Sequence, residues 1–198
     1  MKKWLIPLLV IGGLVLIAVL IFSGTYNSAV DKQETTRQMW ADVESAYQRR
    51  NDLIDNLVNT VKGAADFERS TLTEVVEARA KATSVNVDAE NLSEEQVARF
   101  QQAQGEVSSA LSRLLVTVER YPELRATQNF QQLQSQLEGT ENRINVARNR
   151  YNEAATNYNS YIRRFPNNLI AGMYGFDRMP AFEAEAGAEQ APEVEFEF

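Results

Sequence analysis

The sequence predicts an all-α protein in which an amino-terminal transmembrane helix continues into an antiparallel bundle of long helices, followed by a short apolar distal segment and an extended tail. Three observations predict this fold. A long uncharged, apolar stretch lies near the amino terminus. Proline occurs only at positions 7, 122, 166, 180 and 192, so residues 8–121 and 123–165 lack this helix breaker. Within the second of these stretches, apolar residues recur at every seventh position, as they do along the seam of a coiled coil.

The first predicted element is a membrane anchor, assigned to residues 1–25. Its apolar core runs from Trp4 to Phe22 without a charged residue. A bilayer-spanning helix needs about 20 such residues, whereas the apolar part of a cleaved signal peptide has roughly 7–15. No A-x-A cleavage pattern follows, because the next residues read SGTY. We therefore favour a retained anchor in contact with the lipid bilayer over a signal peptide.

Basic residues give the expected orientation of this anchor. Lys2, Lys3 and the terminal amine lie at one end, and Lys32 and Arg37 lie within twenty residues of the other. Basic groups are retained on the cytoplasmic side. The amine and the shorter separation of Lys2 and Lys3 from the span favour a cytoplasmic amino terminus, with the bundle outside.

The second predicted element is the helical bundle of residues 26–165, with helices at roughly 26–83, 93–119 and 127–164. Ser93 begins a capping-box pattern, Thr127 is a candidate N-cap, and Pro166 is expected to end the third helix. The third helix carries a heptad seam of Phe130, Leu137, Ile144, Tyr151, Tyr158 and Phe165. The second carries Val97, Phe100, Gln104, Val107, Leu111, Leu114, Val118 and Tyr121. The first carries Trp40, Val43, Tyr47, Ile54, Leu57, Val61, Ala65, Leu72 and Val76.

The stripe of the first helix shifts phase around residues 65–68, next to Gly63, where we expect its packing to change. Three helices joined in an up-down-up path would carry Phe165 to the end of the bundle remote from the bilayer. Polar clusters at residues 49–56 and 141–150 suggest contacts between helices, with Arg143 or Arg150 within reach of acidic residues on the first helix. The Tyr and Asn residues of 151–161 suggest stacking surfaces, although seam packing explains the tyrosines more simply.

The remaining elements are an apolar distal segment, residues 166–182, and an acidic tail, residues 183–198. The distal segment either caps the bundle or forms a surface for self-association, and insertion into the membrane is a third alternative. The tail alternates Val and Phe with Glu, which is a strand pattern, so it is either disordered or pairs with another chain. The predicted self-association or partner interface consists of Phe165, Pro166, Leu169, Ile170, Met173, Tyr174, Phe176, Val194, Phe196 and Phe198.

Composition argues against most catalytic classes. The chain has no His and no Cys, which excludes imidazole bases, thiol nucleophiles and His-bound zinc. The formal net charge is −7, and no basic run of the kind that binds nucleic acid is present. No phosphate loop or calcium-binding loop occurs. We therefore predict a protein that is not an enzyme, has no catalytic or metal-binding residues, and requires no cofactor.

Five stretches of the sequence are distinctive: YQRRNDLIDNLVNTVKG at residues 47–63, VVEARAKA at 75–82, LEGTENRINVARNRYNEAATNYNSYIRRFP at 137–166, NLIAGMYGF at 168–176 and the closing APEVEF. In this order they resemble the LemA family of bacterial membrane proteins. Asp55 departs from the pattern, which usually has proline at that position. The resemblance covers nearly the whole chain and implies a single-pass anchor and an α-helical bundle, without an established activity or site residues.

The expected function is therefore structural. We predict a non-enzymatic, membrane-anchored helical scaffold that self-assembles as a homo-oligomer in the bacterial cell envelope, with its single-pass anchor in the inner membrane and its bundle in the periplasm. The alternative is an adaptor that recruits an envelope protease, enzyme or signalling partner through the distal segment and tail. The biological process, the partner and the number of subunits do not follow from the sequence.

Overall fold

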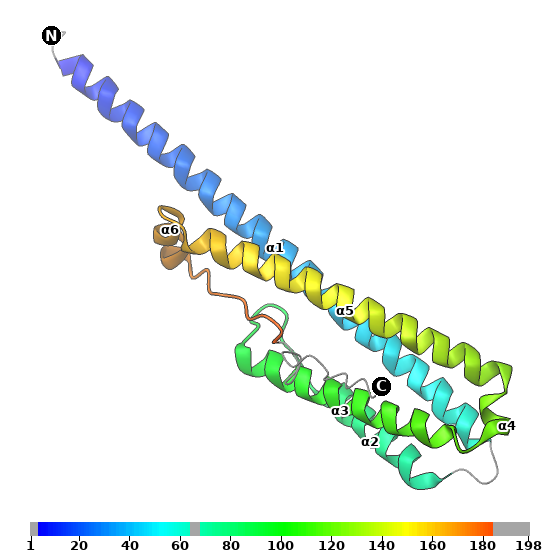
Figure 1. Ribbon diagram of the computed structural model, residues 1–198. Coiled ribbons are helices and arrows are strands. Elements are labelled where there is room, and N and C mark those ends of the chain that lie inside the picture. The colour runs from blue at the N-terminus through cyan, green and yellow to red at the C-terminus, as the bar shows by residue number, and fades with distance from the viewer. Residues whose placement is uncertain (1–3, 64–67, 184–198) are drawn as a thin grey trace, which may run out of the picture.

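The computed structural model describes residues 4–63 and 68–183, and within these ranges the chain is helical without strands. Its elements are α1 (Leu5–Lys62), α2 (Arg69–Ser84), α3 (Glu94–Val118), α4 (Pro122–Arg125), α5 (Gln128–Arg163) and α6 (Asn167–Tyr174). Figure 1 shows α1 running from the amino terminus, at the upper left, down into a bundle formed with α2, α3 and α5. The predicted all-α class, with a long amino-terminal helix that continues into an antiparallel bundle, is confirmed.

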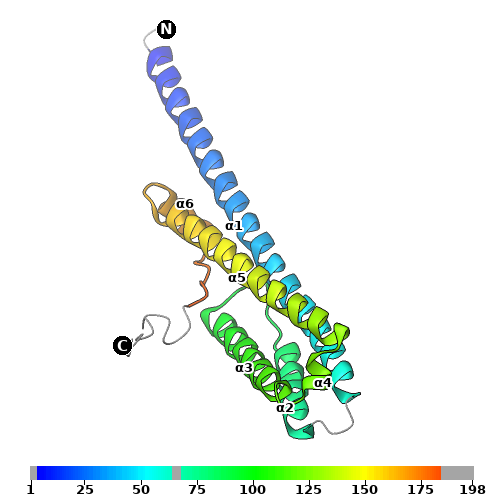
Figure 2. The same cartoon turned by 45° about the vertical axis from the view of Figure 1, so that its right-hand side comes forward.

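The start of α1 is suited to a membrane. One helix of the described residues is long and apolar enough to cross a bilayer, and it lies within Pro7–Lys62. Its most apolar window has a mean hydropathy of 2.6, and none of that window is buried. The segment therefore projects away from the bundle (Figure 2) and could contact lipid.

Local sequence signals set the ends of α3 and α5. The Ser93 hydroxyl accepts a hydrogen bond from the Gln96 backbone N–H, and the Gln96 side chain accepts one from the Ser93 N–H, which completes the predicted capping box. The Thr127 hydroxyl caps α5 by accepting from the Phe130 N–H. Helix α5 ends at Arg163, three residues before Pro166, as expected for a chain approaching proline.

The first predicted bundle helix, at 26–83, is wrong as a single element. Helix α1 ends at Lys62, with Gly63 as its C-cap, and the chain reverses into α2. In the stripe, Val75 is buried in place of Val76, and Ala65 lies outside the described residues. The reversal occurs at the phase shift read from the sequence, and it adds one antiparallel pass to the bundle.

This extra pass also corrects the predicted path of the chain. With α2 running back and α3 returning, α5 runs alongside α1 toward the membrane segment (Figures 1 and 2). The prediction that the distal segment lies far from the bilayer is therefore wrong. Helix α6 instead packs beside Phe22 and Tyr26, where the apolar part of α1 ends.

The buried side chains form two clusters along the bundle. One joins α1, α2 and α3 with the first part of α5, and includes Ile54, Val75, Val107 and Leu137. The other lies nearer the membrane segment. It joins α1, the start of α3 and the rest of α5, and includes Trp40, Phe100, Tyr151 and Tyr158. The predicted seam residues of α3 and α5 lie in these clusters, with three exceptions. Gln104 is buried outside them, Tyr121 lies past the end of α3 and is partly buried against the first cluster, and Phe165 is past the end of α5 and exposed.

Candidate functional site

The most exposed apolar surface outside the membrane segment is formed by α6 and the residues just before it. Phe165, Leu169 and Met173 are 81%, 58% and 71% exposed. Leu169 and Met173 are four residues apart in α6, so they share one side of this helix. Together with Phe165, which precedes the helix, we call them the apolar α6 face. Ile170 and Ala171 are buried and attach α6 to the bundle.

Aromatic contacts hold α6 against α1 at the edge of its apolar stretch. The Tyr174 ring lies 5.9 Å from the Phe22 ring and 4.9 Å from the Tyr26 ring, both edge to face. Phe176 contacts Tyr26 at 5.6 Å. Such pairs add about 0.5–1.5 kcal/mol beyond the area they bury. Gly175 ends α6 in a left-handed conformation (φ 70°) that allows the chain to turn back.

An apolar groove adjoins these rings. It has a volume of about 490 Å³ and is lined by residues of α1 together with Tyr174. Its α1 wall is formed by Val15, Ala18, Val19, Phe22, Ser23, Tyr26 and Asn27. The groove therefore continues from the apolar stretch of α1 onto α6, and it offers an apolar surface to lipid or to another helix.

After α6 the chain forms an extended carboxyl-terminal strap, residues 176–183, which lies between α5 and α3 (Figure 1). Two asparagines of α5 clamp its backbone. The Asn159 amide donates to the Met179 carbonyl at 2.8 Å and accepts from the Met179 N–H at 2.9 Å. The Asn152 amide makes the same pair of bonds to Phe182, at 3.1 and 2.9 Å. The strap is thus held through its backbone.

Phe182 anchors the strap in the aromatic cluster. It is 5% exposed and stacks on Trp40, with ring centroids 5.5 Å apart and planes at 9°. Tyr151 meets the same ring edge to face at 5.5 Å, and the Arg148 guanidinium lies 5.0 Å from the ring centroid. The Tyr151 hydroxyl donates to the Pro180 carbonyl at 2.7 Å. One side chain of the strap therefore ties α1 and α5 together.

Burial perturbs two tyrosines beneath the strap. Desolvation raises the pKa of the Tyr151 hydroxyl well above its usual value of about 10. Desolvation, with a smaller contribution from Asp177, raises the pKa of Tyr158 to about 12. Both phenols are therefore neutral near pH 7, and they act as seam residues whose rings are buried.

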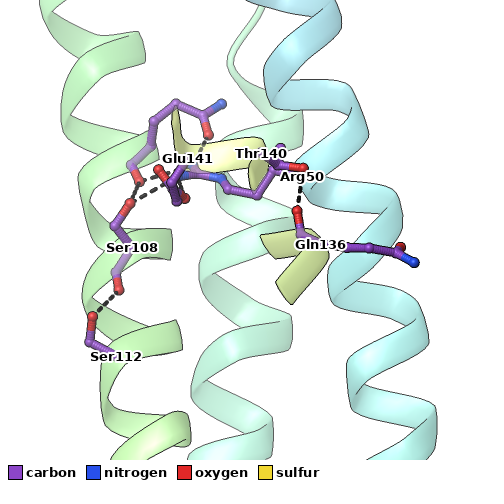
Figure 3. A network of polar contacts seen from close by, with 7 residues as sticks. Arg50, Ser108, Ser112, Gln136, Thr140 and Glu141 are labelled. Carbon is purple, nitrogen blue, oxygen red and sulfur yellow. Dashed lines mark hydrogen bonds and ion pairs between the residues drawn. The ribbon is translucent and has the colours of Figure 1, made fainter. Parts of the chain in front are cut away.

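A polar layer separates the two buried clusters (Figure 3). Arg50 of α1 is 1% exposed, and its guanidinium reaches α3 and α5 at once. It donates to the Gln104 carbonyl at 3.1 Å, the Ser108 hydroxyl at 2.8 Å and the Glu141 carboxylate at 3.0 Å, and also to the Gln104 side chain. A buried charge is tolerated only with partners of this kind. We interpret the layer as a structural contact that fixes the register of three helices.

The polar pairing expected from the sequence is reversed in the structure. The cation comes from α1 and the carboxylate from α5, whereas Arg143 and Arg150 are exposed and form no ion pair with α1 within the described parts of the chain. Gln104, a polar residue at a seam position, is buried and accepts from Arg50. No group of three or more His, Cys, Asp or Glu that could hold a metal ion occurs among residues 4–63 and 68–183.

The structure places the predicted interface residues in three environments. Phe165, Pro166, Leu169, Met173 and Tyr174 are exposed, Ile170 is buried, and Phe176 is partly buried against α1. Val194, Phe196 and Phe198 lie outside the described residues. Sequence reasoning did not identify Met179 and Phe182 as anchors. The seven-residue spacing of Asn152 and Asn159 beside the seam tyrosines was the available signal for the strap that they hold.

The sequence of this chain is similar to those of several known proteins. A family model described as the LemA family matches residues 39–196. The magnetosome protein MamQ 2 of Paramagnetospirillum magneticum is 29% identical over 182 residues, covering 83% of this chain and 66% of the relative. The LemA protein of Metamycoplasma hominis is 24% identical over 164 residues, covering 83% of this chain and 71% of the relative. The match thus spans just under two thirds of the MamQ relative.

Proposed function

Because the chain belongs to the LemA family, we propose that it is a non-enzymatic, membrane-anchored helical scaffold of the bacterial cell envelope that self-assembles beside the bilayer. The observation that carries the proposal is the apolar surface shared by α1 and α6. The apolar α6 face and the groove between Tyr174 and the α1 span adjoin each other. Exposed apolar surface of this kind is typical of protein or membrane contacts.

Pairing of helices from two copies explains the apolar surface of α1 and α6 better than a bundle cap exposed to solvent does. At the edge of a membrane segment, a second copy can place its own α1 in the groove and its own apolar α6 face against the first. The α1 wall of the groove contains Ala18 and Ser23 among larger residues, and small residues allow helices to approach closely. In this arrangement the scaffold assembles laterally, with the anchors of neighbouring copies in contact.

Cysteine crosslinking tests the proposal directly, because the native chain has no Cys. A Met173→Cys variant is oxidised in native membranes. We expect a disulfide-linked dimer from this position and none from Ser135→Cys, an exposed position at the start of α5. In mild detergent the wild-type particle should be large and uniform, and Leu169→Glu with Met173→Glu should make it smaller.

A strictly monomeric wild-type particle, together with absent Met173→Cys dimers, would overturn self-assembly. If that monomer carried a stoichiometric foreign protein, the adaptor function would replace the scaffold. We further propose that the amino terminus is cytoplasmic and the bundle periplasmic. Alkaline phosphatase fused to the carboxyl terminus should then be active, and an inactive fusion that is stably produced would reverse this orientation.

A further inference from the structure

The strap points into a second groove that its described residues do not fill. This groove lies between α3 and α5, has a volume of about 850 Å³, and begins at Phe182 and Glu183. It follows α5 from Asn152 back to Gln134, with Leu111 of α3 and Leu137 of α5 among its lining residues. Those 18 residues of helix span about 27 Å, the length of about eight residues of extended chain.

After Glu183 the glutamates of the sequence occur only at alternate positions, as expected for an extended chain that turns one face to a groove and the other to solvent. All six glutamates of residues 183–198 occupy odd positions, and the even positions read Ala, Ala, Ala, Gln, Pro, Val, Phe and Phe from residue 184 onward. Side chains of an extended chain alternate between its two faces. The last four described residues of the strap show the same phase, because Pro180 and Phe182 are buried whereas Ala181 and Glu183 are exposed, and Met179 just before them is buried as well.

Helix α5 carries a third asparagine at the spacing of the two that bind the strap backbone. Asn152 and Asn159 are seven residues apart on α5 and hold strap residues that are three apart. Seven helical residues rise about 10.5 Å and three extended residues about 10 Å, so the two spacings match. One more step along α5 leads to Asn145, which is exposed and lines the groove. Its amide would meet the backbone close to Glu185.

We propose that residues 184–190 of the chain's own tail continue the strap into the α3–α5 groove, with alanines 184, 186 and 188 facing the groove and the glutamates facing solvent. The occupant is this tail because Glu183 already lies at the mouth of the groove, where its carbonyl accepts from the Gln101 side chain at 2.9 Å and from Arg148 at 3.2 Å. The outward glutamates avoid the groove's own Glu138 and Glu141. This inference does not depend on self-assembly.

Backbone hydrogen exchange of the full-length protein in mild detergent tests the proposal. Amides of residues 184–190 should exchange at least about fivefold more slowly than in the free peptide of the same sequence, since one net hydrogen bond changes an opening equilibrium by about this factor. Asn145→Ala should remove most of this protection. Asn142→Ala should not, because Asn142 is an exposed asparagine of α5 that does not line the groove.

A second pair of variants tests whether the alanines face the groove and the glutamates face solvent. Ala186→Glu should release the tail, whereas Glu185→Ala should leave it protected. Exchange at the free-peptide rate in the wild-type chain would overturn the proposal, as would equal effects of Asn145→Ala and Asn142→Ala. Protection that disappears on dilution would also overturn it, because the groove would then hold the tail of a second copy.

Discussion

Replacing Phe182 with alanine removes the strap side chain that stacks among the aromatic rings of α1, α3 and α5. The ring touches Trp40, Tyr151 and Phe100, and it is nearly fully buried. Truncation of a buried Phe to Ala costs about 3–5 kcal/mol when the surrounding structure cannot collapse. The strap can detach as a unit and relieve the cavity, so we expect a loss of about 3 kcal/mol.

Trp40 reports this change. Its side chain is fully buried beneath Phe182, and the only other tryptophan is Trp4. In a Trp4→Phe background, Phe182→Ala should shift Trp40 emission to the red and lower the urea midpoint of unfolding. Val116→Ala is the control, because Val116 of α3 is exposed away from the α6 face and its truncation should change stability by less than about 0.5 kcal/mol. If Phe182→Ala left emission and midpoint equal to those of the control, the strap would not stabilise the bundle.

Two further predictions concern buried polar groups. Tyr151→Phe should cost about 1 kcal/mol near pH 7, because the Pro180 carbonyl loses its donor, whereas Tyr158→Phe should be neutral, since its hydroxyl has no partner within the described residues. Stability should fall as pH rises from about 10 toward 12, where these phenols ionise in the unfolded chain but stay protonated when folded, and each variant should flatten that fall. Arg50→Ala should cost about 3 kcal/mol in denaturant unfolding, and less once Glu141→Gln is also present.

Specific outcomes would contradict the tyrosine and Arg50 predictions. Equal costs for the two tyrosine variants would mean that the bond to Pro180 contributes nothing. Unchanged alkaline unfolding in both variants would assign the pH dependence to other groups. Strict additivity of Arg50→Ala and Glu141→Gln would show that the two side chains are not energetically coupled, although they lie 3.0 Å apart.

Periodicity predicted most of what the helices bury, because each seam depends on local spacing alone. The seam residues of α3 and α5, the caps at Ser93 and Thr127, and the stop before Pro166 all follow from neighbours a few positions away. The direction of α5 did not follow. It depends on the number of reversals before it, and the reversal between α1 and α2 appeared in the sequence only as a phase shift beside Gly63.

The strap was missed for a different reason. Met179 and Phe182 lie in a proline-containing stretch without helical or strand periodicity, and the asparagines that hold them are 20 and 30 residues away along the chain. Asn152 and Asn159 bind the strap through its backbone, which requires no particular strap side chain. The strap sequence therefore gives little indication of these contacts. The exposed apolar α6 face was identified from the sequence, whereas its position beside Phe22 required the correct path of α1 to α5.

Because α1 is one unbroken helix, its apolar start and its bundle end move together. No helix end separates the membrane-spanning stretch from the buried residues Trp40 and Ile54, and α6 braces the helix where it leaves the apolar stretch. From Phe22 to Lys62 the helix rises about 60 Å, so a tilt of about 20° in the bilayer would carry its far end about 20 Å sideways. With the apolar stretch in a bilayer, a change in its tilt would therefore displace the whole bundle.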